Sequence, residues 1–176
     1  HYTRIGAEQS CHPDYRHRLL EAQTRILESR KQVVEWLQHI PIVVGTITSV
    51  SGRMELFAIR QCCGAIIDEA SQVLEPQLMG LLSAVSTSHS KLGSETSHSS
   101  CSIPKFVLIG DHKQLPAVVR QSENTSIVQS PMLHDVGLDS MANSLFQRLY
   151  HLSVQHGWHH AQGYLDVQGR MHPQIC

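Results

Sequence analysis

The chain has 176 residues, which is enough for one domain with a hydrophobic core. Its 14 basic and 15 acidic residues nearly cancel, so the net charge argues neither for nor against binding to nucleic acid. No stretch approaches the roughly 20 apolar residues of a membrane span and no secretory signal is recognisable, so we expect an intracellular protein, cytoplasmic or nuclear.

The first half of the chain predicts alternating helices and strands. Residues 12–38 carry apolar side chains at helical spacing, which indicates one long helix or two shorter ones. Pro41 ends this helical region, and residues 42–49 predict a strand that runs into a hydroxyl-rich loop. A short helix over residues 54–61 and a strand over residues 64–68 follow.

The second half continues the alternation around polar segments. Residues 76–85 predict a helix, and residues 86–103, dominated by Ser, His and Thr, predict a flexible surface insertion. A strand is expected over residues 105–110. Residues 121–139 hold polar and turn residues and predict a long loop, and residues 140–152 predict a helix.

Strands that alternate with helices predict a parallel sheet with helices on both faces. The apolar runs at residues 65–67 and 106–109 contain β-branched residues, so we expect both strands to be buried on both faces. Residues 164–167 predict a last short strand. Because the chain begins at His1 and ends at Cys176 soon after this strand, we expect an α/β domain truncated at both ends.

Cysteine and histidine predict neither a disulfide framework nor a metal site. The five cysteines are odd in number and form no C-x-x-C pair, which fits a reducing compartment. Thirteen histidines are present, but His159, His160 and the others lack the ligand spacings of structural zinc sites. We interpret them as solvated surface side chains.

Two carboxylates follow the first apolar run directly. Asp68 and Glu69 are expected at the carboxyl edge of the sheet, where ligands of open α/β sheets bind. There Asp68 can hold Mg²⁺, and Glu69 can take a proton from an attacking water. The alternative is that the two residues cap a helical turn near Ser71.

A second polar loop follows the next strand. Gly110 permits a tight turn, and Asp111 can bond loop amides or a metal-bound water. Gln114 both donates and accepts hydrogen bonds, so it can sense whether the terminal phosphate of a nucleotide is present. The alternative is a polar loop held by Pro116. Further along, Arg170 can bond two phosphate oxygens with its planar guanidinium, or it is a surface residue.

Four segments resemble motifs of superfamily 1 helicases, in the 5′-to-3′ branch that includes the nonsense-mediated-decay RNA helicase and the Okazaki-fragment nuclease–helicase. They are Ile67–Gln72 (I-D-E-A-S-Q), Leu108–Pro116 (L-I-G-D-H-K-Q-L-P), Ser144–Leu149 (S-L-F-Q-R-L) and Gln168–Pro173 (Q-G-R-M-H-P). Their order and spacing match the family. The resemblance runs from about Arg4 to the end of the chain, interrupted by the Ser/His-rich insertion.

The resemblance implies a RecA-like domain of the P-loop NTPase type that hydrolyses ATP with Mg²⁺ and moves along single-stranded DNA or RNA. Residues 1–160 would form the C-terminal part of a first RecA-like domain, and residues 161–176 would begin a second. In the family, the residue that matches Asp68 handles Mg²⁺ and the one that matches Glu69 is the catalytic base.

The family also implies roles for residues further along the chain. The residue that matches Gln114 senses the γ-phosphate, and the one that matches Arg170 contacts this phosphate from the second domain. We therefore expect Asp68, Asp111, Gln114 and Arg170 to bind the nucleotide.

A fifth segment resembles the family element that touches the nucleic acid backbone. Thr46, Thr48 and Ser49 would supply short hydroxyl groups, which suit phosphate contacts that do not select a sequence. The alternative is that these hydroxyl groups satisfy their own turn.

The chain departs from the family pattern in two ways. The G-x-x-x-x-G-K-[ST] phosphate loop is absent, so we expect it upstream, with the rest of the second motor domain downstream. Gly169 stands where the family has a Tyr that stacks on adenine. The alternatives are weaker ATP binding through loss of the ring, another residue that stacks on adenine, and an anomaly in the sequence. Two alternatives therefore stay open: a non-helicase P-loop ATPase, and a catalytically inactive helicase-like binding module.

Overall fold

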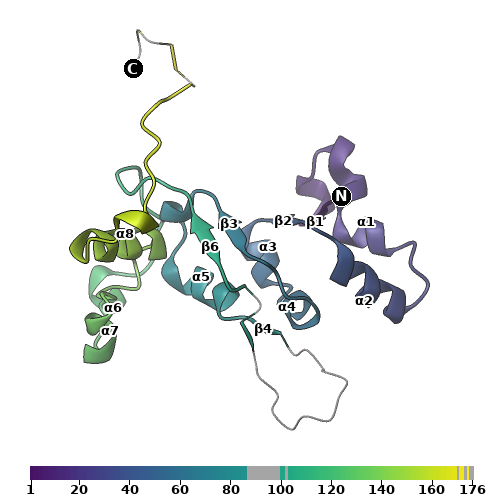
Figure 1. Ribbon diagram of the computed structural model, residues 1–176, viewed down its shortest axis with the longest axis horizontal. Coiled ribbons are helices and arrows are strands. Elements are labelled where there is room, and N and C mark those ends of the chain that lie inside the picture. The colour runs from purple at the N-terminus through teal and green to yellow at the C-terminus, as the bar shows by residue number, and fades with distance from the viewer. Residues whose placement is uncertain (87–99, 102, 170, 173, 175–176) are drawn as a thin grey trace.

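The computed structural model describes all residues except 87–99, 102, 170, 173 and 175–176. The elements form a row, with the N-terminal helices α1 (Leu20–Thr24) and α2 (Arg30–His39) at one end and α8 (Leu145–Gln155) at the other (Figure 1). Within the described part of the chain, every helix is too short or too polar to cross a bilayer.

In the described part of the chain, six short strands lie between and beside the helices. They are β1 (Thr3–Ile5), β2 (Val43–Gly45), β3 (Ala65–Ile67), β4 (Val85–Ser86), β5 (Ser100–Cys101) and β6 (Phe106–Leu108). The remaining α-helices are α3 (Ile47–Ser51), α4 (Glu55–Ile59), α5 (Glu75–Leu82), α6 (Glu123–Ser126) and α7 (Pro131–Asp135). Short 3₁₀ helices cover Glu8–Ser10, Pro13–Arg18, Ala70–Gln72 and His159–Ala161.

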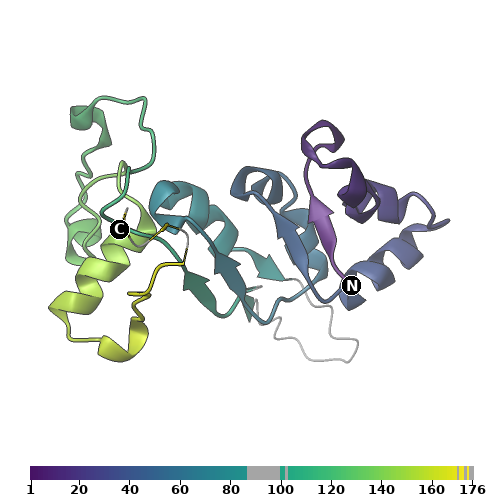
Figure 2. The ribbon, with the colours of Figure 1, turned by 90° about the horizontal axis from the view of Figure 1, so that it is seen from above.

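The strands pair in three two-stranded sheets. β1 pairs with β2 and β3 with β6, both parallel, whereas β4 and β5 pair antiparallel at the base of the Ser/His-rich insertion. Figure 2 shows β6 beside β3 in the middle of the row. The predicted mixture of helices and parallel strands is therefore confirmed, but the described residues do not form one continuous sheet.

Burial on both faces was expected for β3 and β6, and this expectation is wrong. Ile67 is buried with Ala70, Leu78 and Leu145, so α5 and α8 cover one face of β3. Its neighbour Ile66 points to the opposite face and is 76% exposed. The apolar residues of β3 on the covered face are therefore buried, whereas those on the open face are typical of a strand without being buried.

Two further segments differ from the sequence-based expectation, and a third follows one of its two alternatives. Residues 164–167 form no strand, because they extend away from the domain without a pairing partner, and Leu165 is 94% exposed. Residues 121–139 are not a plain loop, since α6 and α7 lie within them. Residues 12–38 contain two short helices, α1 and α2, which is the second of the two predicted alternatives.

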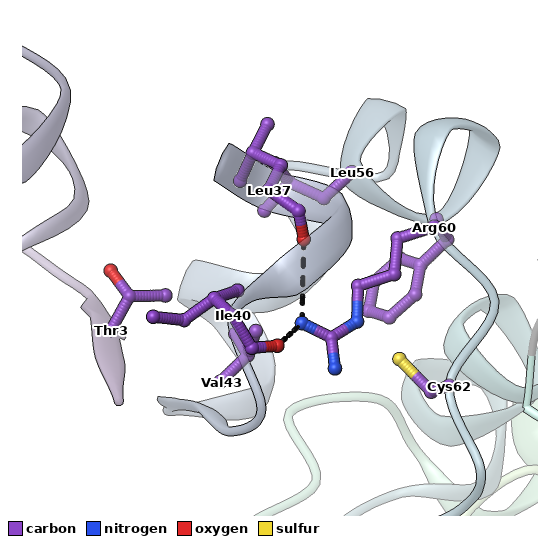
Figure 3. Close-up of a pocket in the computed structure, with 8 residues that line it drawn as sticks. Thr3, Leu37, Ile40, Val43, Leu56, Arg60 and Cys62 are labelled. Atoms are coloured by element: carbon purple, nitrogen blue, oxygen red, sulfur yellow. Dashed lines mark hydrogen bonds between the residues drawn. The ribbon is translucent and has the colours of Figure 1, made fainter. Parts of the chain in front are cut away.

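Helix α2 has defined caps at both ends. Ser29 and Gln32 form a capping box at its N-terminus. At its C-terminus, the Arg60 guanidinium donates to the carbonyl oxygens of Leu37 and Ile40 (Figure 3). It also donates to the carbonyl oxygen of Pro41. The apolar cavity drawn there holds about 20 Å³, room for about one water molecule, so it is a packing feature and not a ligand site.

A buried ion pair fixes α8 to α5. The Glu75 side chain is 4% exposed, and the Arg148 side chain is 14% exposed. Arg148 binds both carboxylate oxygens of Glu75, with its Nε 2.8 Å from Oε2, and its Nη1 donates to the Val136 carbonyl oxygen. Both charges and their hydrogen-bonding groups are therefore satisfied within the protein.

Replacement of Arg148 by Met should destabilise the protein, because the Glu75 carboxylate is left buried without its counter-charge. We expect the free energy of unfolding, measured by urea denaturation, to fall by about 3–5 kcal/mol. The double variant Glu75→Gln/Arg148→Met should regain part of this loss. The control is Arg53→Met, because Arg53 pairs with Glu21 at 2.8 Å on the surface and should contribute about 0–1 kcal/mol. Similar losses in the two single variants would contradict this assignment.

Candidate nucleotide site

The two predicted carboxylates lie where β3 ends. Asp68 and Glu69 are both exposed, and they follow the buried Ile67 directly. The Glu69 backbone N–H donates to Asp68 Oδ1 at 3.0 Å, and Gln72 Nε2 donates to Glu69 Oε2 at 3.1 Å. Glu69 precedes the 3₁₀ turn Ala70–Gln72, but its side chain does not cap this turn. The helix-capping alternative therefore does not account for the Glu69 carboxylate.

Glu69 has an unusual backbone conformation. Its φ of 52° and ψ of 35° lie in the left-handed region, and among the described residues no other non-glycine has a positive φ. This conformation is costly for a residue with a side chain, and it persists only where the surrounding structure enforces it. Such strained residues are concentrated at functional sites.

The loop that follows β6 packs against the turn that follows β3. The backbone N–H of Ile109 donates to the Ile67 carbonyl oxygen, and the N–H of Ala70 donates to the Ile109 carbonyl oxygen, both at 2.8 Å. A Cβ on Gly110 would lie 2.9 Å from the Ser71 backbone nitrogen, so no larger residue fits there. The sequence-predicted acidic turn and Gln114 loop are thus neighbours at one edge of the sheet.

Asp111 organises the second loop. Its Oδ1 accepts the Lys113 N–H at 2.9 Å and its Oδ2 accepts the Gln114 side-chain amide at 3.2 Å, while its own N–H donates to Ser71 Oγ. The bond from the Lys113 backbone, with a smaller contribution from Gln114, lowers the pKa of Asp111 below its usual value. Asp111 therefore bonds loop amides, and it holds the carboxamide of Gln114 at the exposed surface of the loop.

The donor set at this edge suits a magnesium–phosphate ligand better than a protein-caged metal. Among the described residues, no group of three or more His, Cys, Asp or Glu side chains could hold a metal ion. Mg²⁺ needs one or two carboxylates when phosphate oxygens and water complete its coordination, and exposed carboxylates such as Asp68 meet this need. Asp68, Glu69 and Gln114 line neither the small cavity beside Arg60 nor the groove between α3 and α5.

The predicted nucleic-acid residues lie at the start of α3. The Thr46 hydroxyl accepts the Ser49 N–H at 3.2 Å and donates to Ser49 Oγ at 2.9 Å, so these two residues do satisfy their own turn. Thr48 instead lines an open groove of about 310 Å³ between α3 and α5, together with Ser51 and Gln77. Of the three predicted residues, Thr48 is the one that faces an open surface groove.

Residues 163–169, in the segment expected to begin the second domain, are extended and exposed. Gln168 braces this segment, since its side-chain amide donates to the Met171 carbonyl oxygen at 3.0 Å and its Oε1 accepts the Met171 N–H at 2.7 Å. Arg170 lies outside the described residues, so its relation to Gln114 is left as a prediction.

Two supporting residues of the site escaped prediction from the sequence. Ser71, which joins the two loops, is buried and was considered only as a helix-turn residue. His112, next to Asp111, is half-buried and contacts α8 rather than solvent. The contact between Ser71 and Gly110 depends on the register of β3 against β6, and the sequence alone does not give this register.

The comparisons with known proteins agree with these motifs. Residues 14–122 match the AAA domain family. The chain is 30% identical over 150 residues to the DNA replication ATP-dependent helicase/nuclease DNA2 of Gallus gallus, covering 84% of this chain and 12% of that protein. It is also 30% identical over 158 residues to the 3′-5′ exoribonuclease HELZ2 of Mus musculus, covering 89% of this chain and 4% of that protein.

A plant protein gives a similar result. The DNA replication ATP-dependent helicase/nuclease JHS1 of Arabidopsis thaliana is 27% identical over 148 residues, covering 84% of this chain and 9% of that protein. The chain thus spans only a small part of the length of the curated relatives it matches. It belongs to the AAA domain family, and it is homologous to helicases of superfamily 1.

Proposed function

We propose that this chain is part of a motor protein that hydrolyses ATP with Mg²⁺ and couples hydrolysis to movement along single-stranded DNA or RNA. The observation that carries the proposal is the junction of the two loops, at which Gly110 contacts Ser71 and the acidic turn lies beside the Gln114 loop. An intracellular location, cytoplasmic or nuclear, belongs to the same proposal.

Within this proposal the residues of the junction divide the chemistry between them. Asp68 would hold Mg²⁺, which when bound neutralises charge on the β- and γ-phosphates. Glu69 would be the general base, because its carboxylate is exposed directly after β3 and can take a proton from an attacking water. Gln114, oriented by Asp111, contacts the γ-phosphate.

The rest of the site belongs to parts of the protein outside the described residues. Arg170 would contact the γ-phosphate from a second RecA-like domain that begins near residue 161, while residues 1–160 belong to the first. A phosphate loop upstream would grip the β- and γ-phosphates. Relatives that are many times longer than this chain are consistent with such additional segments.

The nucleic acid strand would contact the region around α3. Thr48 is the strongest candidate, because it lines the groove between α3 and α5, while Thr46 and Ser49 would contribute through the backbone that they cap. Contacts of this kind involve phosphate rather than bases, so binding should weaken as the salt concentration rises.

Replacement of Glu69 by Gln in the full-length protein should abolish ATP turnover. The amide cannot accept the proton of the attacking water, so we expect kcat to fall roughly 10²- to 10⁴-fold while ATP still binds. Nucleic-acid-stimulated phosphate release measures turnover, and a fluorescent ATP analogue measures binding. Glu55→Gln is the matched control, because Glu55 is exposed on α4 and lies away from the junction.

The same experiment separates the alternative functions. Unchanged turnover and unwinding in Glu69→Gln would show that Glu69 is not the base and would favour a binding module. If Glu69→Gln abolishes turnover but nucleic acid does not stimulate turnover in the parent protein, the result would instead favour a non-helicase P-loop ATPase.

Replacement of Gln114 by Ala should lower kcat by roughly 10²-fold, the typical effect of losing one polar group aimed at a transition state. It should also raise the pKa of Asp111 partway towards 3.8, because one of the two bonds that lower it is lost while the Lys113 N–H remains. The Asp111 carboxylate loses the hydrogen bonds that it accepts when the pH falls through its pKa. Because this pKa is higher in the variant, the loop of the variant should begin to loosen at a higher pH than the loop of the parent protein. Carboxyl NMR titration measures this change, with Gln121→Ala as control.

A further inference from the structure

One aromatic contact joins the loop after β6 to helix α8. The imidazole of His112 stacks on the phenol ring of Tyr150, with ring centroids 4.3 Å apart and ring planes inclined by 26°. Figure 1 shows α8 beside the chain that leaves β6. His112 is half-buried, whereas its neighbours Asp111 and Lys113 are exposed. The imidazole ring therefore anchors an otherwise exposed loop.

The loop behaves as one small unit because it is closed by its own hydrogen bonds. Asp111 accepts the Lys113 N–H through its side chain and the Gln114 N–H, at 3.2 Å, through its backbone carbonyl oxygen. The Gln114 side chain also returns to Asp111. A displacement of His112, which lies inside this turn, must therefore displace the carboxamide of Gln114.

Helix α8 is a firm support for this ring. Leu145 is buried in the same cluster as Ile67, and Arg148 is bound to the buried Glu75. Ser144 caps the N-terminus of the helix, because its hydroxyl accepts the Gln147 N–H at 3.2 Å. Tyr150 is thus presented by a helix that is fixed to the same core as the acidic turn.

Tyr150 also contacts the segment that follows α8. The Tyr150 hydroxyl lies near that of Tyr164, and hydrogen bonding between them raises the pKa of Tyr164. The Tyr164 hydroxyl also lies 2.9 Å from Gln162 Oε1. Tyr150 therefore lies between the Gln114 loop on one side and, on the other, the stretch that leads to Gln168.

We propose that His112 and Tyr150 are positioning residues for the reaction proposed above, because their stacked rings hold the Asp111–Gln114 turn against α8 and so keep the Gln114 carboxamide ready to meet the γ-phosphate. The inference rests on the proposed function, since the position of Gln114 matters to turnover only if it contacts that phosphate. It adds a specific role for two side chains that carry no chemistry of their own.

Steady-state ATP hydrolysis by the full-length protein, at saturating single-stranded nucleic acid, tests the proposal. His112→Ala and Tyr150→Leu remove the stack, and each should lower kcat by about 3- to 10-fold, the range of one aromatic contact, with KM for ATP nearly unchanged. Tyr150→Phe keeps the ring and should restore kcat. The double variant should be no slower than either single variant, because both remove the same contact.

A direct physical readout accompanies the kinetics. NMR spectra of the histidine ring protons should show an upfield ring-current shift for His112 that Tyr150→Leu abolishes and Tyr150→Phe retains. The matched control is His156→Ala, which breaks a second histidine stack, on Trp158 at 5.0 Å, near the end of the same helix. This control should leave kcat unchanged, because His156 does not contact the Gln114 loop.

The outcomes separate the two levels of the proposal. If Tyr150→Leu and His112→Ala keep the parent kcat while Glu69→Gln abolishes turnover, the positioning role is wrong and the proposed function stands. If Glu69→Gln leaves turnover intact, both are overturned. If Tyr150→Leu lowers the midpoint of thermal unfolding, its lower kcat could come from lost stability. The kcat of His112→Ala then tests the positioning role, because His112 lies in a surface loop. A kcat of His112→Ala equal to that of the parent protein then overturns the positioning role.

Discussion

The candidate site depends on the backbone hydrogen bonds that join the ends of β3 and β6. The Ile109 N–H donates to the Ile67 carbonyl oxygen, and the Ile109 carbonyl oxygen accepts the Ala70 N–H. The segments after β3 and β6 therefore stay in register for one residue beyond the strands. Gly110 can then approach Ser71 without a side chain between them. This register brings the carboxylates after β3 and the amide after β6 to a single edge, and a shift by one residue would turn these side chains to the other face.

Helix α8 stabilises this edge from the side. The Arg148–Glu75 pair connects α8 to α5, which directly follows the acidic turn, and Leu145 packs against the residues that support the turn. The S-L-F-Q-R-L segment therefore has a structural meaning, since its Ser caps α8, its first Leu is buried and its Arg neutralises a buried carboxylate. Arg148 lies in the middle of the apolar pattern of α8 because it pairs with Glu75, which is distant in the sequence.

The sequence predicted the elements whose signals are local. Pro41, the apolar run before Asp68 and the Gly-Asp pair at 110–111 were sufficient to find the strand ends and the polar loops after them. It could not predict which face of β3 is open, because Ile66 and Ile67 are chemically alike and differ only in what packs on them. It also could not predict the contacts of Ser71, Arg148 or His112, because each depends on a partner that lies 40 or more residues away in the chain or on another element.

The residues that would carry the chemistry of the site differ from the residues that hold them in place. Asp68, Glu69 and Gln114 are exposed and make bonds only within their own turns, so their side chains contribute little to the packing of the core. Ser71 and Ala70 are buried beneath them and hold those turns in place, with Glu69 kept in a left-handed conformation by this arrangement. Substitution of the exposed residues should therefore affect turnover while the fold is kept, whereas substitution of the buried residues should affect both. Because these two effects are separable, the proposed motor function can be tested on a folded protein.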